Sequence, residues 1–237
     1  MIAAFTKLPI LKRLIPSIMK RLKLKINYKR NGIIYYLDLR YLVDRRFYLY
    51  GLDDDIINYF NRFIKENNCD YFFDVGSCWG LYSLQIAKEN PNIHVKAFDV
   101  FKNNIKRLEN SRKINKLENI ECINVAVGDE KKIETFSVES LHSPNYGRDF
   151  DAKYKIQVHQ DKIDNMIDLK EKKITIKIDV ERSEVEVLKG ARNLLQNNKC
   201  FLVVETEKIE TTTFLAQLGY KRLDDNFDPI NLFFSNY

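Results

Sequence analysis

The stretch FFDVGSCWGLYSLQIAKENP, residues 72–91, decides the fold. It begins with an apolar run, continues through a short segment with Gly76 and Gly80, and ends with apolar residues at helical spacing. This order predicts a buried strand over residues 71–75, a tight turn, and a helix over residues 79–89. Because glycine has no Cβ, the turn can bring bare backbone close to a ligand.

The kind of ligand is narrowed by what surrounds the two glycines. Their G-x-x-x-G spacing differs from the G-x-G-x-x-G of dinucleotide sites, and the Gly-Lys-Ser/Thr of a P-loop is absent. Asp74 directly before the turn would repel a pyrophosphate but attract an ammonium or sulfonium group. The alternative is an ordinary strand-to-helix turn that binds nothing.

Outward from this unit, apolar strands alternate with amphipathic helices. Further strands are predicted over 94–99, 120–124, 174–179, 201–205, 220–223 and 230–234, and helices over 102–114, 184–196 and 210–218. An irregular, β-rich interval covers 132–159, a helix follows the acids at 53–55, and residues 32–43 suit an early strand or hairpin arm. The pattern predicts an α/β fold with a mostly parallel, seven-stranded sheet and helices on both faces.

Charge separates the chain into a basic extension and an acidic body. Nine Lys or Arg and no acid precede Asp38, so the net charge of +6 becomes −3 when these nine are removed. We therefore expect an extension over residues 1–50 and one domain over 51–237. An acidic body argues against a broad nucleic-acid groove.

Residues 7–25 place apolar side chains at helical spacing with cations between them. This arm could lie on an anionic membrane surface, dock on a partner, or cover the core of its own domain. No run of 18 apolar residues predicts a transmembrane helix. The four scattered cysteines and three histidines predict neither a disulfide framework nor a metal site, and fit a reducing cytoplasm.

Acidic residues end four of the predicted strands, where ligands bind to sheets of this type. Asp99, about 20 residues past the glycines, suits a ribose, and Ala126 offers a flat place for an adenine ring. Taken alone, Asp99 could be a solvated acid, and the segment after Ala126 could be a plain β-turn made by Gly128 and Asp129. The other two ends carry Asp179 and Glu205.

Three blocks in order resemble the S-adenosylmethionine (AdoMet)-dependent class I methyltransferases, and more narrowly the FkbM family. They are DVGSCWGLYSLQIA against D-V-G-A-N-x-G-x-x-S, VKAFDVFKNNIKRLENSRKINKLENIECINVAVGD against A-F-E-P…N…L…N…A-V-G, and KIDVERSEVEVLKGARNLL against K-I-D-V-E-G-x-E…V-L-x-G. FLVVE, which ends at Glu205, matches the family's strand-end glutamate. The resemblance covers residues 31–207 and implies a Rossmann-like methyltransferase fold.

By position, the resemblance implies a cofactor site for AdoMet made of Asp74, Gly76, Ser77, Cys78, Gly80, Tyr82, Ser83, Asp99, Val100, Ala126 and Val127. Asp99 would hold the ribose, and Ala126 and Val127 would flank the adenine. Asp179 would face the donor methyl group with Glu181 behind it, as the catalytic residues. His142, Arg182 and Glu205 are candidates for contact with the acceptor.

Four residues depart from the family pattern. Cys78 replaces Asn, Asp99 replaces Glu, Val100 replaces Pro and Arg182 replaces Gly. A thiol is a poor substitute for an amide in hydrogen bonding. Arg182 could narrow the pocket, bind an anionic acceptor such as a sugar phosphate, or point to solvent.

The resemblance implies O-methylation of a sugar or natural-product hydroxyl, which needs a base to take the hydroxyl proton. Asp179 is the expected base, and its alternative is a structural role such as an ion pair with Lys177 or Lys189. We expect an O-methyltransferase acting on a saccharide or glycolipid, with a non-catalytic AdoMet-fold protein in glycan assembly as the alternative. A nucleic-acid methyltransferase is a weaker third reading, since DVERS stands where those enzymes often have N-P-P-Y or D-P-P-Y.

Overall fold

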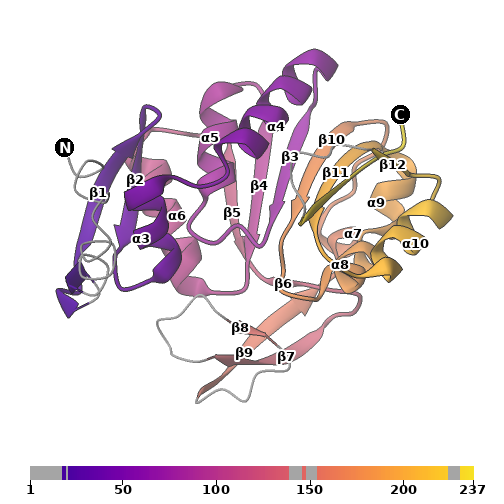
Figure 1. The fold of residues 1–237 in the computed structure, drawn as a ribbon. Coiled ribbons are helices and arrows are strands. Elements are labelled where there is room, and N and C mark those ends of the chain that lie inside the picture. The colour runs from indigo at the N-terminus through magenta and orange to yellow at the C-terminus, as the bar shows by residue number, and fades with distance from the viewer. Residues whose placement is uncertain (1–17, 20, 139–145, 148–153, 224–229) are drawn as a thin grey trace.

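A seven-stranded sheet forms the centre of the molecule (Figure 1). The computed structural model describes residues 18–19, 21–138, 146–147, 154–223 and 230–237. The strand order is β12-β13-β11-β10-β3-β4-β5. Their bounds are β3 Tyr71–Val75, β4 His94–Asp99, β5 Ile120–Asn124, β10 Lys173–Ile178, β11 Lys199–Glu205, β12 Lys221–Leu223 and β13 Asn231–Ser235. The predicted α/β class and seven strands are confirmed.

The sheet is mixed, because one strand, β13, runs against the others. β3, β4, β5, β10 and β11 pair in parallel, whereas β13 pairs antiparallel with both β11 and β12. The parallel strands put their carboxyl ends at one edge. β3 lies between β10 and β4, so the chain leaves it in one direction and later returns to its other side. This reversal is the point at which ligands bind in open α/β sheets.

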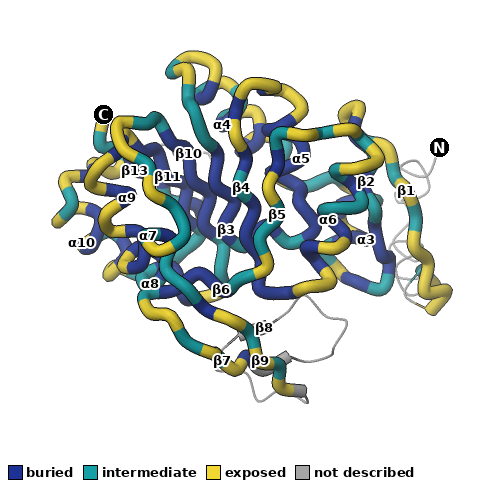
Figure 2. The backbone as a smooth tube through the Cα atoms, turned by 180° about the vertical axis from the view of Figure 1, so that it is seen from behind, coloured by how far each residue is buried: buried dark blue, intermediate teal, exposed yellow. Residues whose placement is uncertain are grey.

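Helices cover both faces of the sheet, as predicted. α4 (Asp54–Asn67), α5 (Leu81–Glu89) and α6 (Lys102–Ile114) belong to one side, and α7 (Ile163–Met166), α8 (Glu184–Gly190), α9 (Arg192–Asn197) and α10 (Ile209–Gln217) to the other. Successive residues of β3 serve the two faces: Phe72 packs in the same cluster as Phe60 of α4, and Phe73 in the same cluster as Leu188 of α8. Apart from Lys96 and residues at the strand ends, β3, β4, β10 and β11 are accordingly buried (Figure 2).

Several predicted boundaries were wrong, among them the following three. The helix expected over 184–196 is divided into α8 and α9 at Ala191, whose φ of −111° and ψ of 14° are not helical. The helix expected from residue 79 starts at Leu81, because Gly80 has a left-handed φ of 90°. The apolar run expected as strand to residue 43 ends at Asp38, and Leu42 already opens the helix α3 (Leu42–Tyr50).

The N-terminal part contributes a hairpin to the main core. β1 (Lys25–Arg30) and β2 (Ile33–Asp38) pair antiparallel, and β1 was not among the predicted strands. The backbone N–H of Tyr36 donates to Ser111 Oγ at 2.8 Å, which ties β2 to α6. Ile33, Tyr35 and Leu37 lie in the same apolar cluster as Phe72. Most of the predicted 7–25 arm, residues 7–17 and 20, lies outside the described residues.

A second, smaller sheet fills the irregular interval and lies at the carboxyl edge of the first (Figure 1). Its order is β6-β9-β7-β8, with bounds β6 Ala126–Val127, β9 Tyr154–Asp161, β7 Lys132–Val138 and β8 Tyr146–Gly147. β6 directly follows β5 in the chain, so the small sheet is joined to the main one by a single residue. Every helix in the described part of the chain is too short or too polar to cross a membrane.

Candidate active site

Asp74, at the end of β3, is fixed by the helix that follows it. Its Oδ2 accepts hydrogen bonds from both the backbone N–H and the hydroxyl of Ser83, near the start of α5. The carboxyl group is fully buried, and burial raises its pKa to about 6, against the opposing effects of the Ser83 bonds and the Lys177 charge. Asp74 therefore links the turn to α5. A nearby positive charge would be needed to keep its carboxyl group ionised below about pH 6.

The two glycines are required by contacts inside the protein. Gly76 has φ +88°, and a Cβ on it would lie 1.8 Å from the carbonyl oxygen of Asp179. Gly80 has φ +90°, and its Cβ would lie 2.2 Å from Leu108 Cδ1. The first glycine thus allows the chain after β3 to touch the chain after β10, and the second allows α5 to approach α6. At both glycines the close neighbour is another part of the protein, and approach to a ligand stays a prediction.

Ser77 and Cys78 lie between the glycines and differ in their hydrogen bonding. Ser77 Oγ is buried and has no hydrogen-bond partner among the described residues. Cys78 has a left-handed φ of 50°, a conformation in which Asn is favoured over most residues. Its backbone N–H donates to Asp99 Oδ2 at 2.9 Å, and burial raises the pKa of its thiol. The change from the family's Asn therefore keeps the backbone link to Asp99.

Asp99 is held at the end of β4 by three donors. Oδ1 accepts from Phe101 N–H at 2.7 Å and Asn104 Nδ2 at 3.1 Å, and Oδ2 accepts from Cys78 N–H. A carboxylate offers about four acceptor positions, so about one is left for a ribose hydroxyl. Burial raises the pKa of Asp99 to about 7, and the three donors lower it in part.

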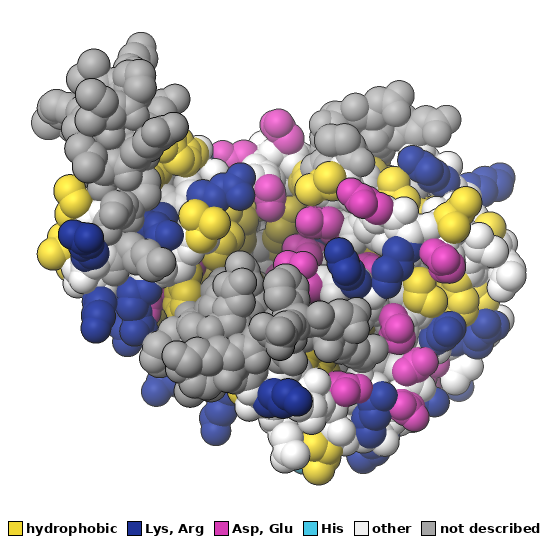
Figure 3. Space-filling view, turned by 60° about the horizontal axis from the view of Figure 1, so that its bottom comes forward, with side chains coloured by type: hydrophobic (Ala, Val, Ile, Leu, Met, Phe, Trp, Pro, Cys, Tyr) yellow, Lys and Arg dark blue, Asp and Glu magenta, His cyan; other side chains and the backbone are white. Residues whose placement is uncertain are grey.

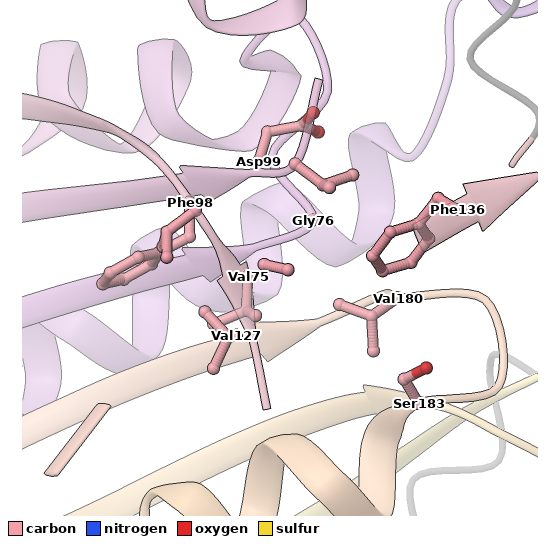
Figure 4. A pocket seen from close by; sticks show the side chains of 11 residues that line it. Val75, Gly76, Phe98, Asp99, Val127, Phe136, Val180 and Ser183 are labelled. Atoms are coloured by element: carbon pink, nitrogen blue, oxygen red, sulfur yellow. The ribbon is translucent and has the colours of Figure 1, made fainter. Parts of the chain in front are cut away.

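A narrow, mostly apolar cavity lies between Asp99 and the loop after β10 (Figure 4). Ala126 and Val127, which were expected beside the adenine, line it together with Val100 and Gly76. Phe136 of β7 points into it from the second sheet, a residue that sequence reasoning did not identify. The alternation of ETF within β7 could have shown an inward aromatic, but not that β7 crosses the cavity.

The loop over residues 179–184 separates this cavity from a larger, polar one. Val180 and Ser183 line the apolar cavity, whereas Asp179, Glu181 and Glu205 line a groove of about 560 Å³ at the ends of β10 and β11. Acidic side chains gather beside a hollow on this face of the molecule (Figure 3). The loop therefore brings an apolar compartment and an acidic compartment to the same carboxyl edge.

Arg182 lines the acidic groove and is exposed. Its φ is +78° and that of Glu181 is +51°, so two consecutive non-glycine residues are left-handed. The family's Gly at position 182 suits this backbone, and Arg182 is strained in it. Its N–H donates to Glu184 Oε1 at 2.7 Å, and its carbonyl oxygen accepts from Lys208 Nζ.

Asp179 and Glu205 face the same side of the sheet with Lys177. Lys177 Nζ lies 3.9 Å from Asp179 Oδ2 and 3.6 Å from Glu205 Oε2, which is the structural pairing considered for Asp179. Tyr82 donates its hydroxyl to Asp53 Oδ2 at 3.0 Å, directly before α4. Asp53 and Lys177 were not among the predicted site residues. His142 lies outside the described residues.

The residues of the apolar cavity suit the parts of AdoMet in kind. Ala126, Val127 and Phe136 offer apolar surface for an adenine, and Asp99 one free acceptor position. Ser77, in the glycine turn beside the cavity, has a buried hydroxyl without a hydrogen-bond partner among the described residues. The cavity itself measures about 30 Å³, roughly the room of one water molecule. An adenine ring therefore enters only if a wall such as Phe136 moves outward. Among the described residues, no cluster of three or more His, Cys, Asp or Glu suits a metal ion.

Comparison with known proteins supports the fold. No protein-family model and no curated protein matches the sequence. Among solved structures, the chain resembles methyltransferase FkbM from Methylobacillus flagellatus KT, with a TM-score of 0.53 at 14% identity over 97% of this chain and 60% of that one. A putative caffeoyl-CoA O-methyltransferase from Staphylococcus aureus has a TM-score of 0.47 at 13% identity, covering 78% of this chain and 83% of that one.

TYW2 of M. jannaschii in complex with AdoMet has a TM-score of 0.45 at 12% identity, covering 90% of this chain and 84% of its own. The present chain spans 60% of the length of the FkbM structure. At such low identity the FkbM match shows a shared fold, and it confirms the Rossmann-like methyltransferase architecture.

Proposed function

We propose that this protein is an AdoMet-dependent O-methyltransferase whose acceptor is a sugar hydroxyl of a glycan or glycolipid. The observation that carries the proposal is the 179–184 loop, which lines the apolar cavity with Val180 and the acidic groove with Asp179. In a fold shared with a methyltransferase, the polar groove next to the apolar cavity supports an acceptor site beside a cofactor site.

The residues for the cofactor are those that line the apolar cavity and the glycine turn. AdoMet, when bound, supplies a methyl group already activated on a sulfonium. Ala126, Val127 and Phe136 exclude water around the adenine, Asp99 accepts from the ribose, and Ser77 binds the amino-acid end. Asp74 adds a negative charge near a cationic ligand, provided that it is ionised.

The residues for the acceptor are the carboxylates of the groove. Asp179 lies at the end of a rigid central strand, which fixes its position better than a mobile loop would. It takes the proton from the acceptor hydroxyl as the new oxygen–carbon bond forms. Neutral sugars suit the groove because carboxylate oxygens accept hydrogen bonds from hydroxyl groups. A glycolipid acceptor agrees with a basic segment over residues 7–25 near an anionic surface.

The experiment incubates the protein with methyl-labelled AdoMet and fractionated cell glycans, and follows label transfer. Wild type is expected to label one fraction, and Asp179→Asn to lose transfer by at least about a hundredfold because the proton acceptor is gone. Asp179→Asn should retain its affinity for S-adenosylhomocysteine. Transfer at the wild-type rate by this variant would contradict the role of Asp179.

A second function is favoured by the cavity of about 30 Å³, which is too small for an adenine as it stands. In that case the chain is a non-catalytic AdoMet-fold partner in glycan assembly. The two functions differ in one property: the enzyme binds S-adenosylhomocysteine saturably, and the non-catalytic partner does not.

A further inference from the structure

Lys177 is a buried cation in the central strand β10. Its side chain is 2% exposed, and Nζ has no hydrogen-bond partner among the described residues. Nζ lies within 4.0 Å of Asp179 and Glu205 but forms a hydrogen bond with neither. The ring of Tyr82 covers it from the third side, with its centroid 5.6 Å from Nζ.

Stability alone does not explain this lysine. A buried ammonium without hydrogen bonds is costly, and apolar residues in its place are often neutral or stabilising. Its neighbours on the opposite face of β10, Ile176 and Ile178, are buried in the usual apolar manner. Lys177 instead faces the carboxylates that end β10 and β11, which points to a functional reason for its charge.

Charged or titratable groups from every adjacent element face the cluster formed by Lys177, Asp179 and Glu205. Asp74 ends β3, Asp53 precedes α4, and Tyr82 projects from α5. The groove side adds Glu181, Arg182, Glu184, Glu207 and Lys208. Within the cluster, Lys177 is the one cation that touches both Asp179 and Glu205 in the described part of the chain.

We propose that Lys177, Asp179 and Glu205 form one coupled acid–base unit, in which Lys177 and Glu205 position and tune the carboxylate that receives the acceptor's proton. Its catalytic role rests on the methyl transfer proposed above, whereas the coupling of the three side chains does not. In the transfer, the acceptor oxygen bonds to the methyl carbon as the sulfonium sulfur–carbon bond breaks, with its electron pair left on sulfur. The hydroxyl proton passes to Asp179.

Asp179 and Lys177 shift the pKa of Glu205 in opposite directions. Burial raises the pKa of Glu205 to about 7, the nearby negative charge of Asp179 raises it further, and Lys177 opposes both. Removing either neighbour should therefore move the titration of Glu205, and in opposite senses. A lysine that served only as packing would produce no such pair of shifts.

The test is a ¹³C NMR titration of the protein labelled at glutamate side-chain carboxyl carbons, with the Glu205 signal identified by its loss in Glu205→Gln. Lys177→Met is expected to raise the midpoint of the Glu205 titration by roughly one pH unit, and Asp179→Asn to lower it by a similar amount. Lys173→Met is the matched control, because Lys173 lies on the same strand and donates to Asn67 O, far from Glu205. It should leave the midpoint unchanged.

An unchanged midpoint in Lys177→Met or in Asp179→Asn would overturn the proposal. Should Lys177→Met fail to fold, Asp179→Asn decides alone, because Asp179 is 43% exposed and its loss leaves the core intact. The titration needs neither cofactor nor acceptor. Its failure is therefore distinct from a failure to bind S-adenosylhomocysteine, which would remove the methyltransferase function instead.

Discussion

Arg182 and Cys78, two of the residues that depart from the FkbM pattern, share a left-handed backbone. Their φ angles are 78° and 50°. Gly and Asn, which the family has at these places, are the residues that adopt this region most readily. The departures therefore add local strain, while the backbone hydrogen bonds of both residues remain in place.

Replacing Arg182 by glycine should relieve that strain. We expect Arg182→Gly to raise the free energy of unfolding by about 0.5–1 kcal/mol, since left-handed backbone costs an L-residue about 1–2 kcal/mol and the entropy of glycine offsets part of the gain. Urea unfolding measures it. Lys116→Gly is the control, because exposed Lys116 has φ 56° in the turn after α6 and should gain as much. A loss in Arg182→Gly beside a gain in the control would show that the Arg182 side chain stabilises the fold.

Gly76 and Gly219 separate steric contact from backbone strain. Both have φ near +87°, but a Cβ meets the Asp179 carbonyl oxygen at Gly76 and nothing within 4 Å at Gly219. Gly76→Ala should therefore lower the free energy of unfolding by at least about 3 kcal/mol, and Gly219→Ala by about 1 kcal/mol. Equal losses in urea unfolding would mean that the contact between the two strand ends is not tight.

Among the elements, the small sheet supplies one wall of the apolar cavity. Phe136 of β7 packs with Val100, Phe101 and Ala126, and its ring faces the space where an adenine is proposed to bind. Phe136→Ala should weaken the affinity for S-adenosylhomocysteine about tenfold, because base–aromatic stacking contributes about 1–3 kcal/mol. Calorimetric titration measures it. Ile133→Ala on the same strand is the control, since Ile133 is 62% exposed and lies away from the cavity. Unchanged affinity in Phe136→Ala would remove the ring from the site.

The elements that the sequence predicted best are those with one strong signal. β3, β4, β5 and α6 have the predicted bounds, because continuous apolar runs and clear helical spacing leave few alternatives. β1 was missed because only two of its six residues, Ile26 and Tyr28, are apolar, which leaves a weak strand pattern. Next to the break between α8 and α9, a Cβ on Gly190 would lie 1.9 Å from the Gly128 carbonyl oxygen, so the helix end touches the loop after β6. Local sequence carries no sign of that contact.

For the site, the sequence could predict positions along strands but not the partners across them. Asp74, Asp99, Asp179 and Glu205 do end strands at the same edge, which follows from parallel pairing. Lys177 and Phe136 required the structure. In the sequence, Lys177 looks like an interruption of an apolar strand. Phe136 reaches the cavity only because β9 pairs with both β6 and β7, which brings β7 to this edge of the main sheet. Roles in binding and catalysis stay predictions.

At the scale of the whole molecule, buried carboxyl groups predict an unusual pH dependence of stability. Burial raises the pKa of Asp44 and Asp74 to about 6 and that of Asp99 to about 7. Such groups take up protons on folding, so their contribution is complete below about pH 4 and is lost as pH rises through 6 to 7. The melting temperature should therefore fall between pH 4.5 and about 7.5. Asp99→Asn should reduce this slope, and a melting temperature that rises across the window would contradict the assignment.

The edge around Gly76, Asp99 and Phe136 is proposed to bind an adenosine-containing sulfonium cofactor, and a calorimetric titration tests this binding. Wild-type protein is titrated with S-adenosylhomocysteine in a calorimeter, with NAD as the control ligand because Asp74 disfavours a pyrophosphate. We predict saturable binding at one site per chain with micromolar affinity for S-adenosylhomocysteine, and none for NAD. Absence of binding at millimolar S-adenosylhomocysteine would contradict the account.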